Sequence, residues 1–226
     1  MSKIKSETLG SQRLLQIAVN KRPELIRSAL CKSGALKKRE SIEWLSPLKA
    51  DRYVEYRDRA AQKSLGLDGN LKVPLSEFWP SRGAVWDGLA IAGDNRPILL
   101  EAKAHIPEAA SPGSKAGPSS LEHIRRSLTA TRRHLAPRSN ADWTGTFYQY
   151  ANRLAYQYYL RVLNGIDSSL VFVNFTNAVD MDGPSTEHEW RGATRLIHAV
   201  MGLPDDLSRF SVFHAYIDAR QLLDVK

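Results

Sequence analysis

The chain has 226 residues, of which 42% are hydrophobic and 25% charged, and this balance is typical of a globular protein rather than a disordered or fibrous one. Its length suits one substantial domain. Lys and Arg number 32 against 24 Asp and Glu, which gives a formal net charge of +8. An excess of positive charge favours a polyanionic partner such as nucleic acid.

The sequence gives no sign of export or of membrane insertion. No run of residues approaches the roughly 20 apolar positions needed to span a bilayer, and residues 1–13 lack the apolar core of a secretory signal. We therefore expect a cytoplasmic protein without a membrane partner. Cys31 is the only cysteine, which excludes an intrachain disulfide and a cysteine-based zinc cluster.

Apolar spacing predicts helices at the N-terminus. Residues 11–31 have helical periodicity, and Pro23 divides them into two helices because it cannot continue a helical hydrogen-bond ladder. A basic connector follows at 32–40. A third helix is predicted from Pro47 to about Leu65, with acidic residues at helical spacing along one stripe. These acidic residues are Asp51, Glu55 and Asp58.

The middle of the chain predicts a β-hairpin. Residues 84–92 and 97–105 have strand character, and 93–96 (GDNR) supply strong turn residues between them. The segment 106–120 is rich in Pro, Gly and Ser and is expected to be mobile. The later elements are a basic amphipathic helix at 120–136, an aromatic-rich helix at 143–165, a buried strand at 168–177, a helix at 188–203 and a strand at 208–218. Together they predict an α/β sandwich with a mixed sheet.

The hairpin carries two carboxylates and a lysine at related positions. A turn centred on Asp94 and Asn95 places Asp87 across from Ala102, with an uncertainty of one register step. The residues on either side of that position, Glu101 and Lys103, point to one face of the strand. A register one step away, or a bulge, would place Asp87 on the same face.

These residue types suit a divalent cation. Two carboxylates a few ångströms apart repel each other and raise each other's pKa unless a cation joins them. Mg²⁺ prefers oxygen ligands and keeps several waters, so Asp87, Glu101 and the Ala102 carbonyl could hold it. Lys103 would then hold or deprotonate the attacking water. The alternative is a solvated charged pair beside a turn, since the same spacing occurs at Asp224–Lys226, where no metal site is plausible.

The stretch WDGLAIAGDNRPILLEAK (86–103) resembles the core of the PD-(D/E)XK nuclease superfamily, which has the restriction-endonuclease-like fold. The resemblance covers about residues 41–177. It implies that Asp87 takes the first acidic position, Glu101 the second and Lys103 the lysine of the motif. The sequence departs from the family pattern at Trp86, where proline is usual. The implied activity is hydrolysis of phosphodiester bonds with Mg²⁺, or with Mn²⁺ as a substitute.

The resemblance also implies accessory residues on the flanking helices. Many members add a glutamate from the helix before the hairpin, and Glu55 is the candidate. Its rivals are Glu43, Asp51 and Asp58. Some branches use a glutamine after the lysine strand, a position that Gln149 fits loosely, with Arg153 one turn on, where it could reach a phosphate. His105 lies on the Glu101 face one step further along, although a histidine at a strand end is more often incidental.

Nucleic-acid contacts are expected from basic side chains. A backbone track is predicted for Arg82 and for the basic face of the 120–136 helix, which comprises Arg125, Arg126, Arg132 and Arg133. Several tyrosines of the 143–165 helix could stack on bases, but their helical spacing indicates that most of them pack in the core. These are Tyr148, Tyr150, Tyr156, Tyr158 and Tyr159.

The sequence thus predicts a single α/β domain over 1–226, with a helical extension at 1–40, a nuclease core at 41–177 and a C-terminal helix and strand at 178–226. The expected function is that of a Mg²⁺-dependent nuclease with DNA favoured over RNA as substrate. The alternative is a non-catalytic nucleic-acid-binding or complex-forming protein that retains the fold. A homodimer would suit double-strand cutting, but the sequence gives no evidence for it.

Overall fold

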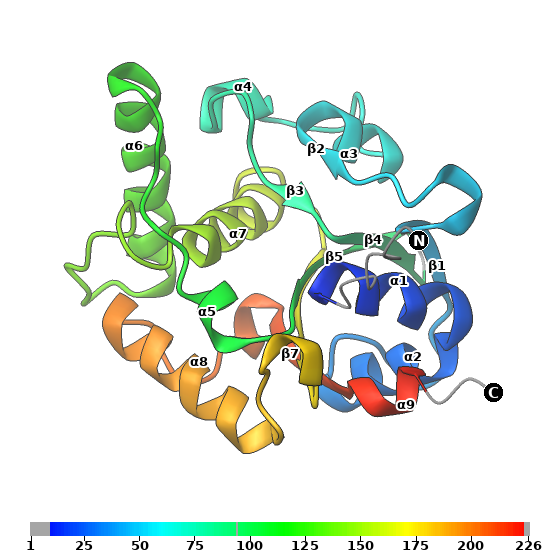
Figure 1. The fold of residues 1–226 in the computed structure, drawn as a ribbon. Coiled ribbons are helices and arrows are strands. Elements are labelled where there is room, and N and C mark those ends of the chain that lie inside the picture. Colours follow the sequence, from blue (N-terminus) through cyan, green and yellow to red (C-terminus); the bar gives the residue numbers. More distant parts are fainter. Residues whose placement is uncertain (1–9, 94, 224–226) are drawn as a thin grey trace, which may run out of the picture.

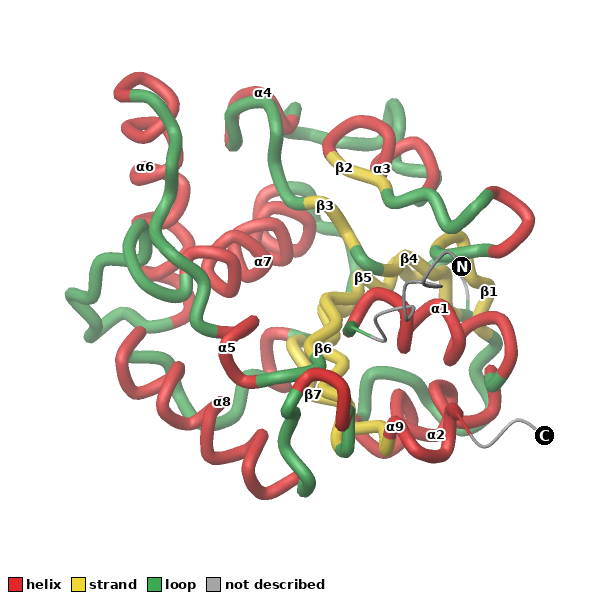
Figure 2. The backbone as a smooth tube through the Cα atoms, viewed as in Figure 1, coloured by secondary structure: helices red, strands yellow, loops and turns green. Residues whose placement is uncertain are grey.

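The structure is a computed structural model that describes residues 10–93 and 95–223. A five-stranded mixed sheet forms its centre, in the order β1-β4-β5-β6-β7 (Figures 1 and 2). The first three strands of that order pair antiparallel and the last three parallel. The strand bounds are β1 (Ile42–Ser46), β4 (Gly88–Ala92), β5 (Arg96–Lys103), β6 (Ser169–Thr176) and β7 (Val212–Asp218). The predicted α/β architecture with a mixed central sheet is confirmed.

Helices bury both faces of this sheet. One face, which includes Leu99 and Leu170, packs against α6 (Pro118–Leu135), α7 (Tyr148–Tyr158) and α8 (Glu187–Met201). The other face, which includes Leu100 and Val173, packs against α1 (Ser11–Lys21), α2 (Pro23–Ser33) and α9 (Ala219–Leu223). Because successive side chains of a strand point to opposite faces, this double burial explains the nearly continuous apolar runs of β5 and β6.

The segments predicted as an extension and a C-terminal addition belong to the same core. Leu14 and Ile26 on the N-terminal helices are fully buried against the sheet. Arg96 at the start of β5 binds Glu40 at 2.8 Å, which fixes the 32–40 connector to the sheet. At the other end of the chain, β7 pairs with β6 along its whole length. Residues 10–40 and 178–223 therefore supply layers that the predicted 41–177 core lacks.

The helix predicted from Pro47 to Leu65 is wrong over its first half. That region instead contains a 3₁₀ turn at Lys49–Asp51, β2 (Tyr56–Arg57) and a short helix, α3 (Asp58–Ser64). The chain reverses at Arg52 and Tyr53, which both have a φ of 61°. This left-handed conformation interrupts a right-handed helix. Pairing of β2 with β3 (Val85–Trp86) therefore outweighed the helical spacing of the tyrosines.

The long aromatic helix begins later than predicted and ends differently. Phe147 has a φ of 66°, so α7 starts at Tyr148 rather than at 143, and one π-helical turn, Tyr159–Leu163, follows it. The 106–120 segment contains α5 (Ile106–Ala109) and then runs beside the start of α7. Ser111 accepts hydrogen bonds there from the amides of Phe147 at 3.1 Å and Gln149 at 2.8 Å. This segment, expected to be mobile, thus forms a wall next to α7.

The described residues also form one short α-helix, α4 (Leu75–Phe78), and two 3₁₀ turns, at Val179–Met181 and Ser208–Phe210. Among residues 10–93 and 95–223, no helix combines the length and apolar character needed to cross a bilayer.

Candidate functional site

The register of the hairpin decides where Asp87 lies. β4 and β5 pair with Gly88 opposite Leu100, so the next position outward places Asp87 opposite Glu101. The sequence predicted Ala102 opposite Asp87 with an uncertainty of one residue, and the structure differs by that one residue. Directly opposed residues of antiparallel strands project from the same face. Asp87, Glu101 and Lys103 therefore share the face that α7 covers.

Asp87 is bound to the strand that carries Glu101. Its Oδ2 accepts a hydrogen bond from the Ala102 amide at 2.7 Å. The N–H and C=O of one strand residue point to the same side, so the Ala102 carbonyl also points toward Asp87 rather than toward β6. This is the orientation that the predicted role of Ala102 requires.

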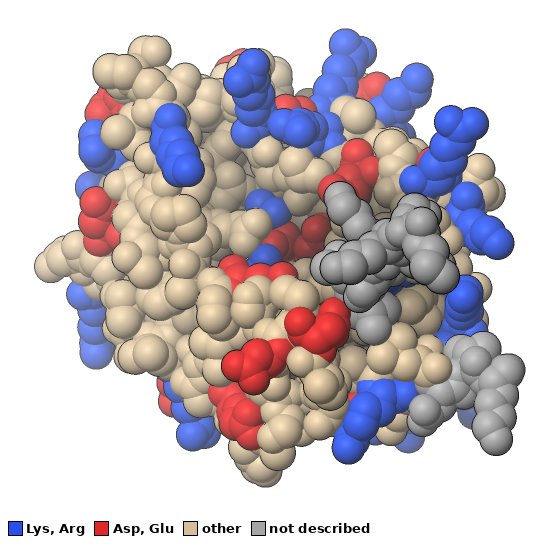
Figure 3. Space-filling view, in the orientation of Figure 1, with Lys and Arg blue, Asp and Glu red and all other residues tan. Residues whose placement is uncertain are grey.

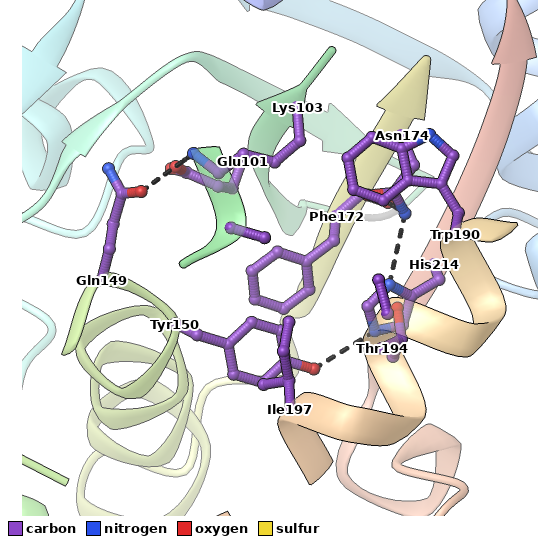
Figure 4. A pocket seen from close by; sticks show the side chains of 12 residues that line it. Glu101, Lys103, Gln149, Tyr150, Phe172, Asn174, Trp190, Thr194, Ile197 and His214 are labelled. Carbon is purple, nitrogen blue, oxygen red and sulfur yellow. Dashed lines mark hydrogen bonds and ion pairs between the residues drawn. The ribbon is translucent and has the colours of Figure 1, made fainter. Parts of the chain in front are cut away.

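Glu101 is buried, with a relative exposure of 1%, and has a cation at each oxygen. Lys103 Nζ lies 2.5 Å from Oε1, and Arg153 Nε lies 2.6 Å from Oε2. Lys103 Nζ also donates to Oε1 of Gln149 at 2.9 Å, as Figure 4 shows. This contact places Gln149 next to Lys103, and its auxiliary role stays a prediction.

The two carboxyl groups have opposite pKa shifts. Burial raises the pKa of Asp87 to about 7, the negative charge of Glu101 adds to the rise, and Lys103 and the Ala102 amide oppose it. Burial also disfavours the ionised form of Glu101, but Arg153 and Lys103 outweigh it and hold its pKa below the ordinary value. Without a bound cation, Asp87 is therefore close to half-protonated near neutral pH.

Arg153 has a different place from the one predicted. Its side chain is buried against Trp86, with the guanidinium carbon 5.0 Å from the ring centroid, and it also donates to the Val85 carbonyl at 2.8 Å. It points to Glu101 rather than to a position where a substrate phosphate could lie. The sequence indicated only that Arg153 lies one helical turn after Gln149. The packing of α7 on β5 is what makes Glu101 its partner.

Glu55 lies near the site but not on a helix. β2 and β3 pair with Tyr56 opposite Trp86, so continuing that ladder by one residue places Glu55 opposite Asp87. Gln12 on α1 donates a hydrogen bond to its carboxylate.

The rivals of Glu55 are less suitably placed. Asp58 accepts the amides of Arg82 at 3.1 Å and Gly83 at 2.8 Å and so fixes the loop before β3. Glu43 is exposed on the edge strand β1, and Asp51 lies in a 3₁₀ turn. Glu55 is therefore the best placed of the four acids to support Asp87.

An open groove of about 600 Å³ leads to these residues. Its walls are the 82–85 loop and the segment 107–115, and Gln149 and Arg153 lie at its floor. Figure 3 shows acidic and basic side chains together in the central hollow of this face. Among the described residues that line it, the exposed cations are Arg82 and Lys115.

The four arginines predicted as a track are on α6 and do not line the groove. Three of them are exposed, and Arg125 lies 3.3 Å from Glu122 on the same helix. Their role in binding stays a prediction.

A small cavity lies behind Lys103, between β6, β7 and α8. Its volume is about 20 Å³, enough for about one water molecule. Figure 4 shows Tyr150 and His214 across this cavity, 3.2 Å apart between Oη and Nε2. Tyr150 also contacts His198 Nε2 at 2.8 Å, and burial lowers the pKa of His214 to about 3.

The other aromatic and histidine candidates are mostly structural. Tyr150, Tyr156 and Tyr159 are buried, as the helical spacing predicts, and Tyr148 and Tyr158 are half-buried. His105 turns toward α5, where its Nδ1 lies 3.5 Å from Glu108.

The oxygen donors at the hairpin suit a hard divalent cation. Residues 10–93 and 95–223 contain no group of three or more His, Cys, Asp or Glu side chains that could hold a metal. A cation here would therefore use Asp87, Glu101, the Ala102 carbonyl and water. Mg²⁺ accepts such a set, because one or two carboxylates with several waters are its usual protein ligands.

The comparisons with known proteins give no relative. No family model, no curated protein and no solved structure matches this chain. The functional assignment therefore depends on the geometry of the hairpin and its groove.

Proposed function

We propose that this protein is a Mg²⁺-dependent nuclease with a restriction-endonuclease-like core, acting in the cytoplasm on DNA in preference to RNA. The observation that carries the proposal is the opposed pair of half-buried Asp87 and buried Glu101, with Lys103 on the same sheet face. Mn²⁺ is expected to substitute for Mg²⁺ because both are hard cations that prefer oxygen ligands.

Each residue has a separate task in this proposal. Asp87, Glu101 and the Ala102 carbonyl hold the cation, which when bound polarises the scissile phosphate and lowers the pKa of a water molecule. Lys103 keeps its ammonium between Glu101 and Gln149, where it orients the attacking water and offsets negative charge in the transition state. Glu55 supports Asp87 from the neighbouring strand.

The groove supports a polymeric anionic substrate. Arg82 and Lys115 stand on its two walls, and the floor residues Gln149 and Arg153 contact Lys103 and Glu101. A phosphate backbone bound between the two walls would lie beside Gln149 and Arg153, the residues that contact Lys103 and Glu101.

Cleavage assays test this function. Plasmid, linear and single-stranded DNA and RNA are incubated with the purified protein, with and without Mg²⁺ or Mn²⁺. We expect cleavage only with metal, and a rate at least about a hundredfold lower for Lys103→Ala, since a positioned cation at the transition state contributes this much. Lys63→Ala, which removes an exposed lysine of α3, is the matched control and should cleave normally.

A second function is favoured by one observation. Both oxygens of Glu101 already have cationic partners, Lys103 and Arg153, as in a site that needs no metal. A non-catalytic nucleic-acid-binding protein with this fold would show that pattern. Binding of DNA without cleavage under any metal would favour this second function over the first.

A further inference from the structure

Arg153 joins the two strands that carry the candidate ligands. Its Nε binds Glu101 on β5 at 2.6 Å, and its terminal nitrogen binds the Val85 carbonyl on β3 at 2.8 Å. Val85 and Trp86 directly precede Asp87, and the guanidinium lies over the Trp86 ring. With a relative exposure of 5%, the side chain is nearly all buried, and only a small part of it reaches the floor of the groove.

This arginine completes a balanced set of charges. Asp87 and Glu101 supply two negative charges, and Lys103 and Arg153 supply two positive charges, so their formal sum is zero. The charge of Glu101 raises the pKa of Asp87, and the charges of Lys103 and Arg153 lower it. Two carboxylates with a single lysine would leave one net negative charge for a divalent cation. Here an added cation would leave two uncompensated positive charges in a largely buried cluster, which is costly.

On the basis of the proposed nuclease function, we propose that Arg153 keeps this cluster neutral, so that a divalent cation binds firmly only together with a substrate phosphate. The phosphate brings the negative charge that the cluster lacks. Arg153 is then a positioning residue rather than a catalytic one. Metal and nucleic acid bind cooperatively, and the metal-free state is the resting state of the protein.

The first experiment uses the wild-type protein. Mn²⁺ binding is followed by electron paramagnetic resonance with and without thymidine 3′,5′-bisphosphate, which has phosphates but no phosphodiester bond to cleave. Thymidine is the uncharged control, and a protein-free titration corrects for Mn²⁺ held by the nucleotide itself. We expect Mn²⁺ to bind at least about tenfold more tightly with the bisphosphate and unchanged with thymidine.

The second experiment removes the compensating charge. Arg153→Met keeps the length of the side chain, and we expect nucleotide-free Mn²⁺ binding to tighten at least about tenfold, because a positive charge near the cation has gone. Arg153→Lys retains the charge and should keep the wild-type dependence on the bisphosphate. Arg161→Met, which removes an arginine from the π-helical turn after α7, should leave Mn²⁺ binding unchanged. Circular dichroism establishes that each variant folds.

The sign of the change separates this role from a purely structural one. If Arg153 only supported the fold, a folded Arg153→Met protein would bind Mn²⁺ equally well or more weakly, and that result would overturn the proposal. Equal Mn²⁺ affinity with and without the bisphosphate in the wild type would also overturn it, even if Arg153→Met cannot fold. Failure to bind Mn²⁺ under every condition would contradict the proposed metal site itself.

Discussion

Oδ2 of Asp87 accepts a hydrogen bond from the Ala102 amide at 2.7 Å, so the first carboxylate is bound to the strand that carries the second. The contact also brings Asp87 close to the charge of Glu101, and burial together with that charge raises the pKa of Asp87 to about 7. Ionisation of Asp87 is therefore disfavoured when no cation is bound. The following predictions depend on this property and on the groove that leads to it.

Asp87→Asn should stabilise the metal-free protein at alkaline pH. The amide oxygen can still accept the Ala102 N–H, while the charge that Glu101 repels is lost. We expect the melting temperature to rise by at least a few degrees and the stabilisation by Mg²⁺ together with thymidine 3′,5′-bisphosphate to disappear. Differential scanning calorimetry measures both. Asp167→Asn, at an exposed pair with Arg161, is the control, and an equal rise there would contradict the assignment to Asp87.

The stability of the metal-free protein should fall as pH rises through about 7. A carboxyl group whose pKa is higher in the folded chain stabilises the fold while it is protonated, so the contribution of Asp87 is complete below its ordinary value of 3.8 and is lost through about 7. The lowered pKa of His214 acts in the opposite direction, and its contribution is complete above about pH 7. Melting temperatures between about pH 6 and pH 8 should therefore fall in the wild type relative to Asp87→Asn.

Mg²⁺ bound together with thymidine 3′,5′-bisphosphate should reverse that fall, because the cation competes with the proton on Asp87. The increase in melting temperature on adding Mg²⁺ and the bisphosphate should be larger at about pH 8 than at about pH 6. An increase that does not depend on pH would show that Asp87 is not a ligand.

Gln149→Ala should slow cleavage rather than weaken DNA binding. Gln149 accepts a hydrogen bond from Lys103 Nζ at 2.9 Å, so its loss frees the ammonium to move away from the attacking water. We expect kcat to decrease by about tenfold or more with little change in KM. Gln221→Ala on the exposed surface of α9 serves as the control. A change in KM alone would place Gln149 in substrate binding instead.

The groove and the basic helix α6 can be compared directly. Arg82 and Lys115 line the groove, whereas Arg125 and Arg126 are exposed on α6 and do not. We expect the double substitution Arg82→Ala/Lys115→Ala to weaken DNA binding and to reduce the salt dependence by about two counterions. Arg125→Ala/Arg126→Ala should have the smaller effect. The reverse order in fluorescence anisotropy titrations would restore α6 as the main backbone track.

Much of the fold was predictable because local patterns agreed with tertiary packing. The division of the N-terminal helices at Pro23, the hairpin and the strand at 168–177 all match the structure. The helix from Pro47 to Leu65 was wrong over its first half because the pairing of β2 with β3 outweighed an apparent helical period. Glu55 therefore directly precedes a strand, β2, rather than lying on a helix. Its expected proximity to Asp87 agrees with the pairing of β2 and β3.

The sequence by itself determined the composition of the candidate site: a carboxylate before one strand of a hairpin, and a carboxylate and a lysine on one face of the next. The period of a β-strand is two, so Glu101 and Lys103 had to share a face. Only the tertiary structure decided that Asp87 joins them, because one residue of register reverses the face. It also decided the role of Arg153, since a buried arginine takes the partner that packing brings to it, and packing between α7 and β5 is not encoded in local spacing.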